Sequence, residues 1–296
     1  MVTLHVAEKD ELDAYVAVWN AITPAEPSDP DQQRERRDRD PRRLYLVAEV
    51  GGEIVGCGFA GPSQSEGRGF LSPRVLPVAR RRGVGAALLA ELGGHLAGLG
   101  FVTASAHVDG ADEGSLAFGS RFGFDEVDRQ VEQVCLVGAH GPESDPPEGV
   151  TLTTLAARPE LLRESYGLAT EGYEDMATFA PVSVTLDDWL SGDDANVPEG
   201  SFVALAGNDV VGFSGLCRNP EGGYEDGLSV VRRDWRRRGL AEALKREKLA
   251  WAAAHGVEEV ATWTQRGNDA MRALNERLGY VYRSVSITVR ADLPLD

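Results

Sequence analysis

The chain has 296 residues, 42% of them hydrophobic, and a formal net charge of −17 at pH 7, so it can form one large domain or two ordinary ones. A surface this acidic repels phosphate backbones and argues against non-specific nucleic-acid binding. No apolar run approaches the roughly 20 residues of a membrane span. The first residues, MVTLHVAEKDEL, lack the basic and apolar regions of a signal peptide. Together these features predict a cytoplasmic protein that has neither nucleic acid nor a membrane as partner.

The first half of the chain begins with VTLHV at 2–6, which matches the start of the second half. The run RERRDRDPRR at 34–43 mixes charges of both signs and is typical of a solvated helix and its exit. The strand-like RVLPV leads into the loop RRRGVG at 80–85. The segment GAHGPESDPPEG at 138–149 is rich in proline, glycine and acid and has little to bury, which predicts a linker.

The second half has the pattern of a mixed sheet with helices on its faces. SFVALAGNDVVGFSGLC, at 201–217, predicts a hairpin about a Gly-Asn-Asp turn. The segment from Arg238 is rich in helix formers and ends at Gly256, a predicted C-cap. The remaining predicted elements are strands at 150–155, 227–231, 258–264 and 282–290 and helices at 159–170, near 186–190 and at 268–279.

Four landmarks recur at one offset of 156 residues. They are Gly83 and Gly239, Gly56 and Gly212, Val47 and Val203, and the FGF and LGY motifs that begin at Phe122 and Leu278. A fixed offset at four places indicates an internal duplication. We expect an N-terminal domain at 1–138, a linker at 139–149 and a C-terminal domain at 150–296.

The repeated loop, RRRGLA at 236–241 in the second copy, lies between a strand and a long helix. The first N–H groups of a helix have no internal partner and carry the positive end of its dipole, so they bind anions such as pyrophosphate. Gly239 lets the backbone approach the phosphates, and the small Ala241 keeps the path clear. Arg236 and Arg238 add cationic donors. The loop is neither a P-loop nor a GxGxxG turn.

The stretches LSVVRRDWRRRGLAEALK (228–245) and TWTQRGNDAMRALNERLGY (262–280) closely resemble the GNAT (Gcn5-related N-acetyltransferase) superfamily. VLPVARRRGVG and DEGSLAFGSRFGF repeat the pattern in the first copy, so the resemblance covers nearly the whole chain. Tandem GNAT proteins, including the mycothiol-synthase type, have this two-copy plan. The resemblance implies acetyl-CoA as donor and an amine as acceptor.

The resemblance also implies which residues of the second copy bind the donor. Pantetheine is expected along the strand residues Ser229, Val230 and Val231, and the pyrophosphate on the amides of Arg236, Arg237, Arg238, Gly239, Leu240 and Ala241. Asn268 matches an asparagine that contacts the CoA arm, although it also fits the N-cap of the last helix. Asp112 replaces it in the first copy.

Acyl transfer needs a group that takes a proton from the amine. In much of the superfamily a strand carboxylate does this, and the second copy offers Glu225 and Asp226. A solvent-facing role for Glu225 stays open. The positions 156 residues earlier are Gly69 and Phe70, and Pro73 interrupts that strand. We therefore expect the N-terminal copy to be degenerate and the C-terminal copy to be catalytic.

The sequence offers several candidates for the group that protonates the departing thiolate. Relatives use a tyrosine where this chain has Asn275, and Gly119 in the first copy. Asn275 could donate a hydrogen bond instead, and Tyr224 or Tyr280 could act as the acid, although Tyr280 also fits the core. Water is a further alternative, since the reference thiol pKa is about 8.5.

Two other features have both a functional and a structural interpretation. The acids of EGYEDM at 171–176 could bind a cationic amine or simply face solvent. His107, at the end of the predicted strand TASAHV, could be a base in the first copy or a hydrogen-bonded, partly buried histidine.

The cysteines Cys57, Cys135 and Cys217 are far apart and lack metal-ligand spacing, so we expect reduced thiols on strands and no metal site. The predicted fold class is α/β (α+β), with two tandem GNAT-like acyl-CoA N-acyltransferase domains, each a mixed central β-sheet flanked by helices. The predicted function is acetyl-CoA-dependent transfer to an amine of a small molecule in a ternary complex, with a homodimer possible. The alternative is a non-catalytic acyl-CoA sensor or scaffold on the same fold.

Overall fold

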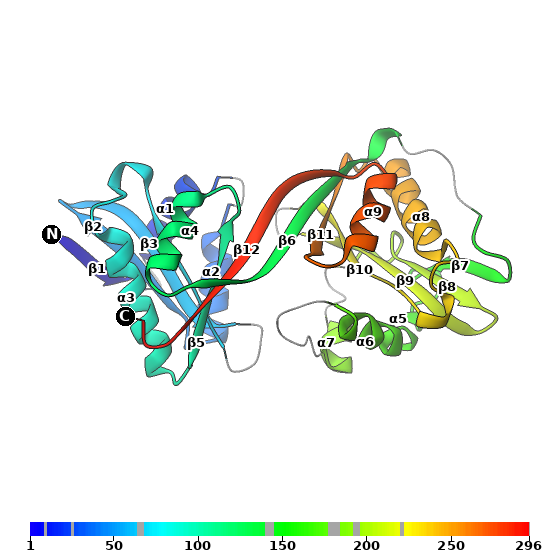
Figure 1. Cartoon of the computed structure of the whole chain (residues 1–296), viewed down its shortest axis with the longest axis horizontal. Coiled ribbons are helices and arrows are strands. Elements are labelled where there is room, and N and C mark those ends of the chain that lie inside the picture. The colour runs from blue at the N-terminus through cyan, green and yellow to red at the C-terminus, as the bar shows by residue number, and fades with distance from the viewer. Residues whose placement is uncertain are drawn as a thin grey trace. The chain divides into compact units, whose positions relative to one another are not determined.

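The computed structural model describes residues 1–8, 11–24, 27–63, 68–139, 145–176, 184–191, 196–219 and 222–295 (Figure 1). The chain forms two compact units. The N-terminal unit comprises Met1–Val127 and Ile287–Asp296, and the C-terminal unit comprises Asp128–Ser286. Each unit is a mixed sheet flanked by helices, as predicted from the sequence.

The N-terminal unit has the strand order β1-β2-β3-β4-β5-β12. Neighbours from β1 to β4 are antiparallel, and β4 is parallel to β5. Its strands are β1 (Val2–Val6), β2 (Leu44–Val50), β3 (Glu53–Pro62), β4 (Gly69–Val75), β5 (Thr103–Asp109) and the end of β12 (Val281–Asp292). Its helices are α1 (Leu12–Ile22), α2 (Pro30–Arg39), α3 (Val84–Gly98) and α4 (Glu113–Arg121).

Glycines on one face of this sheet let α3 pack closely against it. A Cβ atom added at Gly58 would lie 2.8 Å from Leu92 Cδ1, and one at Gly69 would lie 2.7 Å from Leu96 Cδ1. Successive strand residues point to opposite faces, so their neighbours point away from α3. That opposite face carries α1, in a core cluster that includes Tyr15 and Cys57.

The C-terminal unit repeats this plan with the order β6-β11-β10-β9-β8-β7. Figure 1 shows α8 and α9 on one side of the sheet and α5, α6 and α7 on the other. Its strands are β6 (Asp125–Leu136), β7 (Val150–Thr154), β8 (Phe202–Ala206), β9 (Asp209–Arg218), β10 (Tyr224–Val231) and β11 (Glu259–Gln265). Its helices are α5 (Leu161–Glu164), α6 (Tyr166–Glu174), α7 (Leu186–Ser191), α8 (Leu240–Ala254) and α9 (Asp269–Arg277).

The compact units do not coincide with the two sequence copies. β6 ends the first copy in sequence, yet from Asp128 onward it belongs to the C-terminal unit, where it pairs antiparallel with β11. The last residues of the second copy, from Ile287, belong to the N-terminal unit, where the Leu293 N–H donates to the Val102 carbonyl at 2.9 Å. The predicted linker at 139–149 is therefore a boundary in sequence rather than in space, and residues 140–144 of it lie outside the described residues.

We expect Ile287→Ala to destabilise the protein because this side chain, in the final strand, is only 1% exposed. Removing it should lower the free energy of unfolding by about 2–4 kcal/mol. Val281→Ala, in the same strand but at a site that is 59% exposed, is the matched control and should change stability by less than about 0.5 kcal/mol. Urea denaturation checks both values. An equal loss in the two variants would contradict burial as the cause.

Candidate functional site

In each unit two neighbouring parallel strands are hydrogen-bonded only at one end. β4 pairs with β5 at Gly69 and Phe70 and then separates from it. β10 pairs with β11 at Tyr224 and Glu225 and then separates from it. Beyond these pairs the facing strand edges have lost their ladder partners, so backbone donors and acceptors are available to a ligand.

The two copies differ in a β-bulge. The register of β10 against β9 shifts between Asp226 and Ser229, whereas β4 runs against β3 without a shift. The bulge changes the correspondence that the sequence offset predicted. Glu225 corresponds in space to Phe70 rather than to Gly69, and Asp226 corresponds to Leu71. A bulge adds one residue to a strand and so shifts every position before it.

The repeated loop has the same backbone geometry in both copies. Gly83 precedes α3 with φ 84° and Gly239 precedes α8 with φ 82°, and neither helix start has a side-chain cap. Arg81 and Arg237 also have positive φ angles, of 62° and 61°. Such a turn directs successive backbone N–H groups toward one point, which makes an anion-binding concavity.

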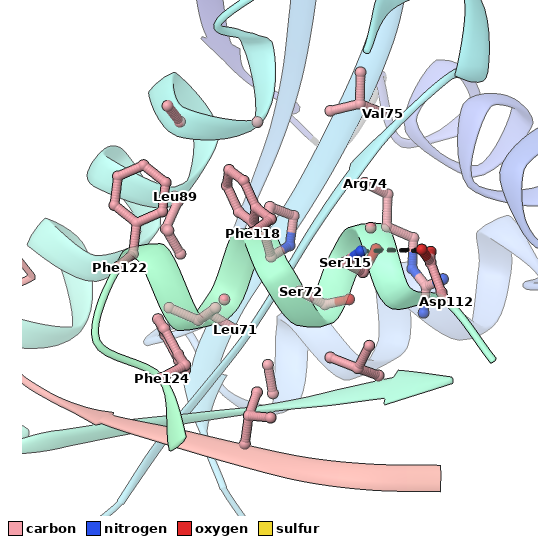
Figure 2. A pocket seen from close by; sticks show the side chains of 18 of the residues that line it. Leu71, Ser72, Arg74, Val75, Leu89, Asp112, Ser115, Phe118, Phe122 and Phe124 are labelled. Carbon is pink, nitrogen blue, oxygen red and sulfur yellow. Dashed lines mark hydrogen bonds between the residues drawn. The ribbon is translucent and has the colours of Figure 1, made fainter. Parts of the chain in front are cut away.

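The N-terminal unit holds a cavity of about 590 Å³ where β4 and β5 separate. Figure 2 shows it between β4, α3 and α4, with Phe118, Phe122 and Phe124 among its side chains. Although the chain is strongly acidic, more arginines than acids line this cavity. The charged residues of the lining are Arg74, Arg80, Arg81, Arg121, Asp109 and Asp112.

The two aspartates of the lining hold local backbone structure. Asp109 Oδ1 accepts from the N–H of Ala111 at 2.9 Å. Asp112 caps α4, with Oδ1 accepting from the N–H of Ser115 and Oδ2 from its hydroxyl. Burial alone would raise the pKa of Asp112, but the bonds from Ser115 and the charge of Arg80 lower it.

The C-terminal unit has a smaller cavity at its copy of the loop, of about 190 Å³. Six of the ten predicted donor-binding residues line it: Val231, Arg236, Arg237, Gly239, Leu240 and Ala241. The other four make local contacts in the structure. Ser229 Oγ lies 2.9 Å from Ser214 Oγ, and Val230 packs against Gly172. Arg238 donates to the Asp234 carbonyl. Asn268 is the N-cap of α9, and its Oδ1 accepts from the Met271 N–H.

The acids at 171–176 contact the arginines at this loop. Arg236 Nη2 lies 2.6 Å from Asp175 Oδ2 and 3.2 Å from Glu171 Oε1, and Arg236 Nε donates to the Val231 carbonyl. Glu171 also accepts from the backbone N–H of Arg233. Carboxylates therefore neutralise two of the cations at the C-terminal loop, Arg233 and Arg236.

Asp226 lies in a sealed ionic cluster. Its side chain is 2% exposed and contacts Lys245 and Lys248, the latter at 2.6 Å, and accepts from the Tyr280 hydroxyl. Lys248 also donates to Ser214 Oγ at 2.9 Å. Burial would raise the pKa of Asp226, but the two lysines outweigh it and hold the value at about 2, while burial lowers the pKa of Lys248 to about 8. A carboxylate so placed is poorly suited to take a proton from a substrate.

The same volume in the N-terminal unit is apolar. The positions of the aspartate and the two lysines are occupied there by Leu71, Leu89 and Leu92. Leu71 and Leu89 line the large cavity. The 156-residue offset could have predicted this difference for the lysines, since it aligns each of them with a leucine.

The remaining predicted catalytic residues lie on different sides of the C-terminal sheet. Glu225 lies opposite Cys217 in the register of β10 and β9, on the side of the sheet that carries α6. Burial is the larger cause that raises the pKa of the Cys217 thiol, and the negative charge of Glu225 helps to raise it. Tyr224 points the other way and packs in the core cluster that includes Leu249 of α8. The structure therefore does not bring Tyr224 and Glu225 together on one face.

Asn275 is fully buried and donates to Gln133 Oε1 at 3.0 Å and to Thr264 Oγ1 at 3.4 Å. Gln133 belongs to β6, which comes from the first copy. No sequence pattern indicates this partner, because 142 residues and a strand exchange separate Gln133 from Asn275.

The described ranges contain no cluster of histidine, cysteine, aspartate or glutamate side chains arranged for a metal ion. Within the same ranges, no helix is both long and apolar enough to cross a membrane. The three cysteines are reduced thiols on β3, β6 and β9, as expected.

We expect Asp226→Ala to lower the free energy of unfolding by about 3–5 kcal/mol, because it leaves two buried lysines without a counter-charge. The triple variant Asp226→Leu, Lys245→Leu, Lys248→Leu carries the leucines of the N-terminal copy. It should be as stable as the wild type or more stable, since well-packed apolar groups often replace a buried ion cluster without loss. Thermal and urea unfolding of both variants check this. A triple variant as unstable as Asp226→Ala would show that the cluster is required by its surroundings.

Comparison with known proteins identifies the family of this chain. The chain matches the model of the Acetyltransferase (GNAT) family twice, at residues 8–124 and 160–280. It is 26% identical over 261 residues to a mycothiol acetyltransferase of Catenulispora acidiphila, covering 81% of this chain and 78% of that protein. It is 32% identical over 90 residues to an acetyltransferase of Pectobacterium atrosepticum, a match that covers 30% of this chain and 63% of that protein.

Two solved structures share the fold over nearly the full length. A GCN5-related N-acetyltransferase from Sphaerobacter thermophilus aligns with a TM-score of 0.78 at 20% identity, covering 98% of this chain and 95% of that one. A tandem GNAT protein from the clavulanic acid biosynthesis pathway aligns with a TM-score of 0.74 at 19% identity, covering 99% and 98%. With one match to the family in each half, the chain belongs to the Acetyltransferase (GNAT) family as a tandem member.

Proposed function

We propose that the protein is an acetyl-CoA-dependent N-acetyltransferase that moves an acetyl group to an amine of a small molecule by direct transfer in a ternary complex. The observation that carries the proposal is the arginine-lined cavity of about 590 Å³ in the N-terminal unit. It joins an uncapped helix start to the gap between two separated strands. A long molecule with a phosphorylated end and a neutral pantetheine arm matches that combination.

In this proposal the donor binds along the N-terminal cavity. The backbone N–H groups at the start of α3, with Arg80 and Arg81, hold the pyrophosphate, and the α3 dipole adds to the attraction. The pantetheine arm lies in the gap between β4 and β5, beside apolar side chains such as Leu71 and Phe118. The net positive lining offsets the acidic surface of the chain for an anionic donor.

The reaction itself needs one proton to move. The amine nitrogen attacks the thioester carbonyl, a C–N bond forms, the C–S bond breaks, and the proton lost by the amine passes to the thiolate. His107 lines the cavity, and its ring meets that of Phe70 edge-on with the centroids 5.2 Å apart. Histidine is the commonest general base in enzymes, so we assign the transient proton to His107.

The sequence instead placed donor and catalysis in the C-terminal copy, and that assignment stays a prediction. Glu225 supports it, because this carboxylate lies beside the bulge on the α6 side of the sheet. The small cavity, the neutralised Arg236 and the sealed Asp226 favour the N-terminal unit for the donor.

A second candidate is an acyl-CoA-binding protein without catalysis. It is favoured by two features of the N-terminal strand: Phe70 occupies the position of Glu225, and Pro73 has no N–H to offer. Release of free thiol from acetyl-CoA in the presence of a panel of amines distinguishes the two, because a binding protein turns over none of them.

Titration calorimetry of acetyl-CoA with the full chain tests where the donor binds. Gly83→Glu places a carboxylate at the anion site and should weaken binding by roughly 10-fold or more. Gly239→Glu, at the equivalent position of the other loop, should leave the affinity unchanged. Gly83→Ala is the control for backbone strain, since both substitutions meet the same positive φ. If only Gly239→Glu abolishes binding, the C-terminal copy holds the donor. If the wild type binds no acetyl-CoA, the proposed function is wrong.

A further inference from the structure

One cation of the N-terminal cavity, Arg74, has no role in the proposed binding of the donor's pyrophosphate. Arg74 lies on β4 opposite Cys57 and so faces α1, away from α3 and the phosphate-binding loop. Its guanidinium lies over the ring of Trp19 at 4.1 Å, and its Nη1 donates to Thr23 Oγ1 at 2.7 Å. Figure 2 shows it among the side chains of the cavity. Trp19 and Thr23 fix the plane and position of this cation.

The Nε edge of Arg74 has no partner among the described residues. Its Nε–H is buried and donates to no acceptor there, and no ion pair joins the guanidinium to a carboxylate in that part of the chain. The two acids of the lining, Asp109 and Asp112, are occupied with Ala111 and Ser115. A half-buried charge and a buried donor without partners are costly, so this edge is suited to an anionic ligand.

The geometry of this unpaired edge indicates which class of ligand it can bind. With Nη1 bound to Thr23, the guanidinium presents Nε and Nη2, which form a planar fork that matches the two oxygens of a carboxylate. The C-terminal copy has Val230 at the corresponding position, packed against Gly172. The fork is therefore a property of the N-terminal cavity alone and not of the repeated fold.

We propose that Arg74 binds the carboxylate of a reacting molecule, so that the substrate pair of this cavity includes a carboxylic acid. The proposal rests on the proposed function. The carboxylate comes either from an amino-acid-like acceptor, whose amine then lies near His107, or from a dicarboxylic acyl group on the donor. In either case the bidentate pair positions the reacting end on the α1 face of the sheet.

The test compares ligands that differ only in the carboxylate. One arm measures binding and thiol release with acetyl-CoA and the common L-amino acids against the same amino acids as amides. The other arm compares succinyl-CoA with acetyl-CoA. We expect preference for the acid form in one arm, and Arg74→Gln should weaken that preference by roughly 30-fold or more. Arg74→Lys should recover part of it, because it keeps the charge and loses the fork.

Arg43→Gln is the matched control, since Arg43 also lies over an aromatic ring, that of Phe59, and does not line the cavity. It should leave the preference unchanged. The proposal is overturned if the wild type prefers the acid form in neither arm, or if Arg74→Gln weakens acetyl-CoA itself by the same factor. If the wild type binds no acetyl-CoA, the proposed function is wrong. Titration of the free protein with amino acids and their amides would then still show whether Arg74 binds a carboxylate.

Discussion

The separation of β4 from β5 after two paired residues is the constraint on which the N-terminal site depends. Parallel strands that continued to pair would close the ladder and leave no room for a ligand. Here pairing ends after Phe70, while β4 stays paired with β3 along its whole length. The strand is thus held on one edge and open on the other. The loop that follows it starts α3 with free N–H groups at the mouth of the opening.

The two copies have filled the same opening in different ways. Leucines and phenylalanines line it in the N-terminal unit and leave a large cavity. In the C-terminal unit two lysines from α8 reach a single aspartate and seal the corresponding space. Arg236 of the C-terminal loop is also paired with Glu171 and Asp175, whereas the buried Nε of Arg74 in the N-terminal unit has no hydrogen-bond partner among the described residues. The charges named here are therefore paired with one another in the C-terminal copy, whereas Arg74 has no counter-charge among the described residues of the N-terminal copy.

Strand exchange makes each unit depend on residues from both sequence copies. The long final strand of each copy crosses the division between the units, so Gln133 of the first copy contacts Asn275 in the C-terminal unit. Val289 of the second copy lines the N-terminal cavity. A change near the end of the chain therefore acts on the N-terminal site.

The sequence by itself determined the fold and the position of the loop. The helix starts and the hairpin are local patterns, the duplication is a repeat at a fixed offset, and the positive φ of Gly83 and Gly239 follows from a glycine before a long helix. The face of a side chain, the register across a bulge and the partner of a charge depend on segments far apart in the chain. For that reason Glu225 and Asp226, adjacent in sequence, lie on opposite faces, and only the second is sealed by lysines. The placement of the Arg74 guanidinium depends on Thr23 and Trp19, some fifty residues away, which no local pattern could indicate.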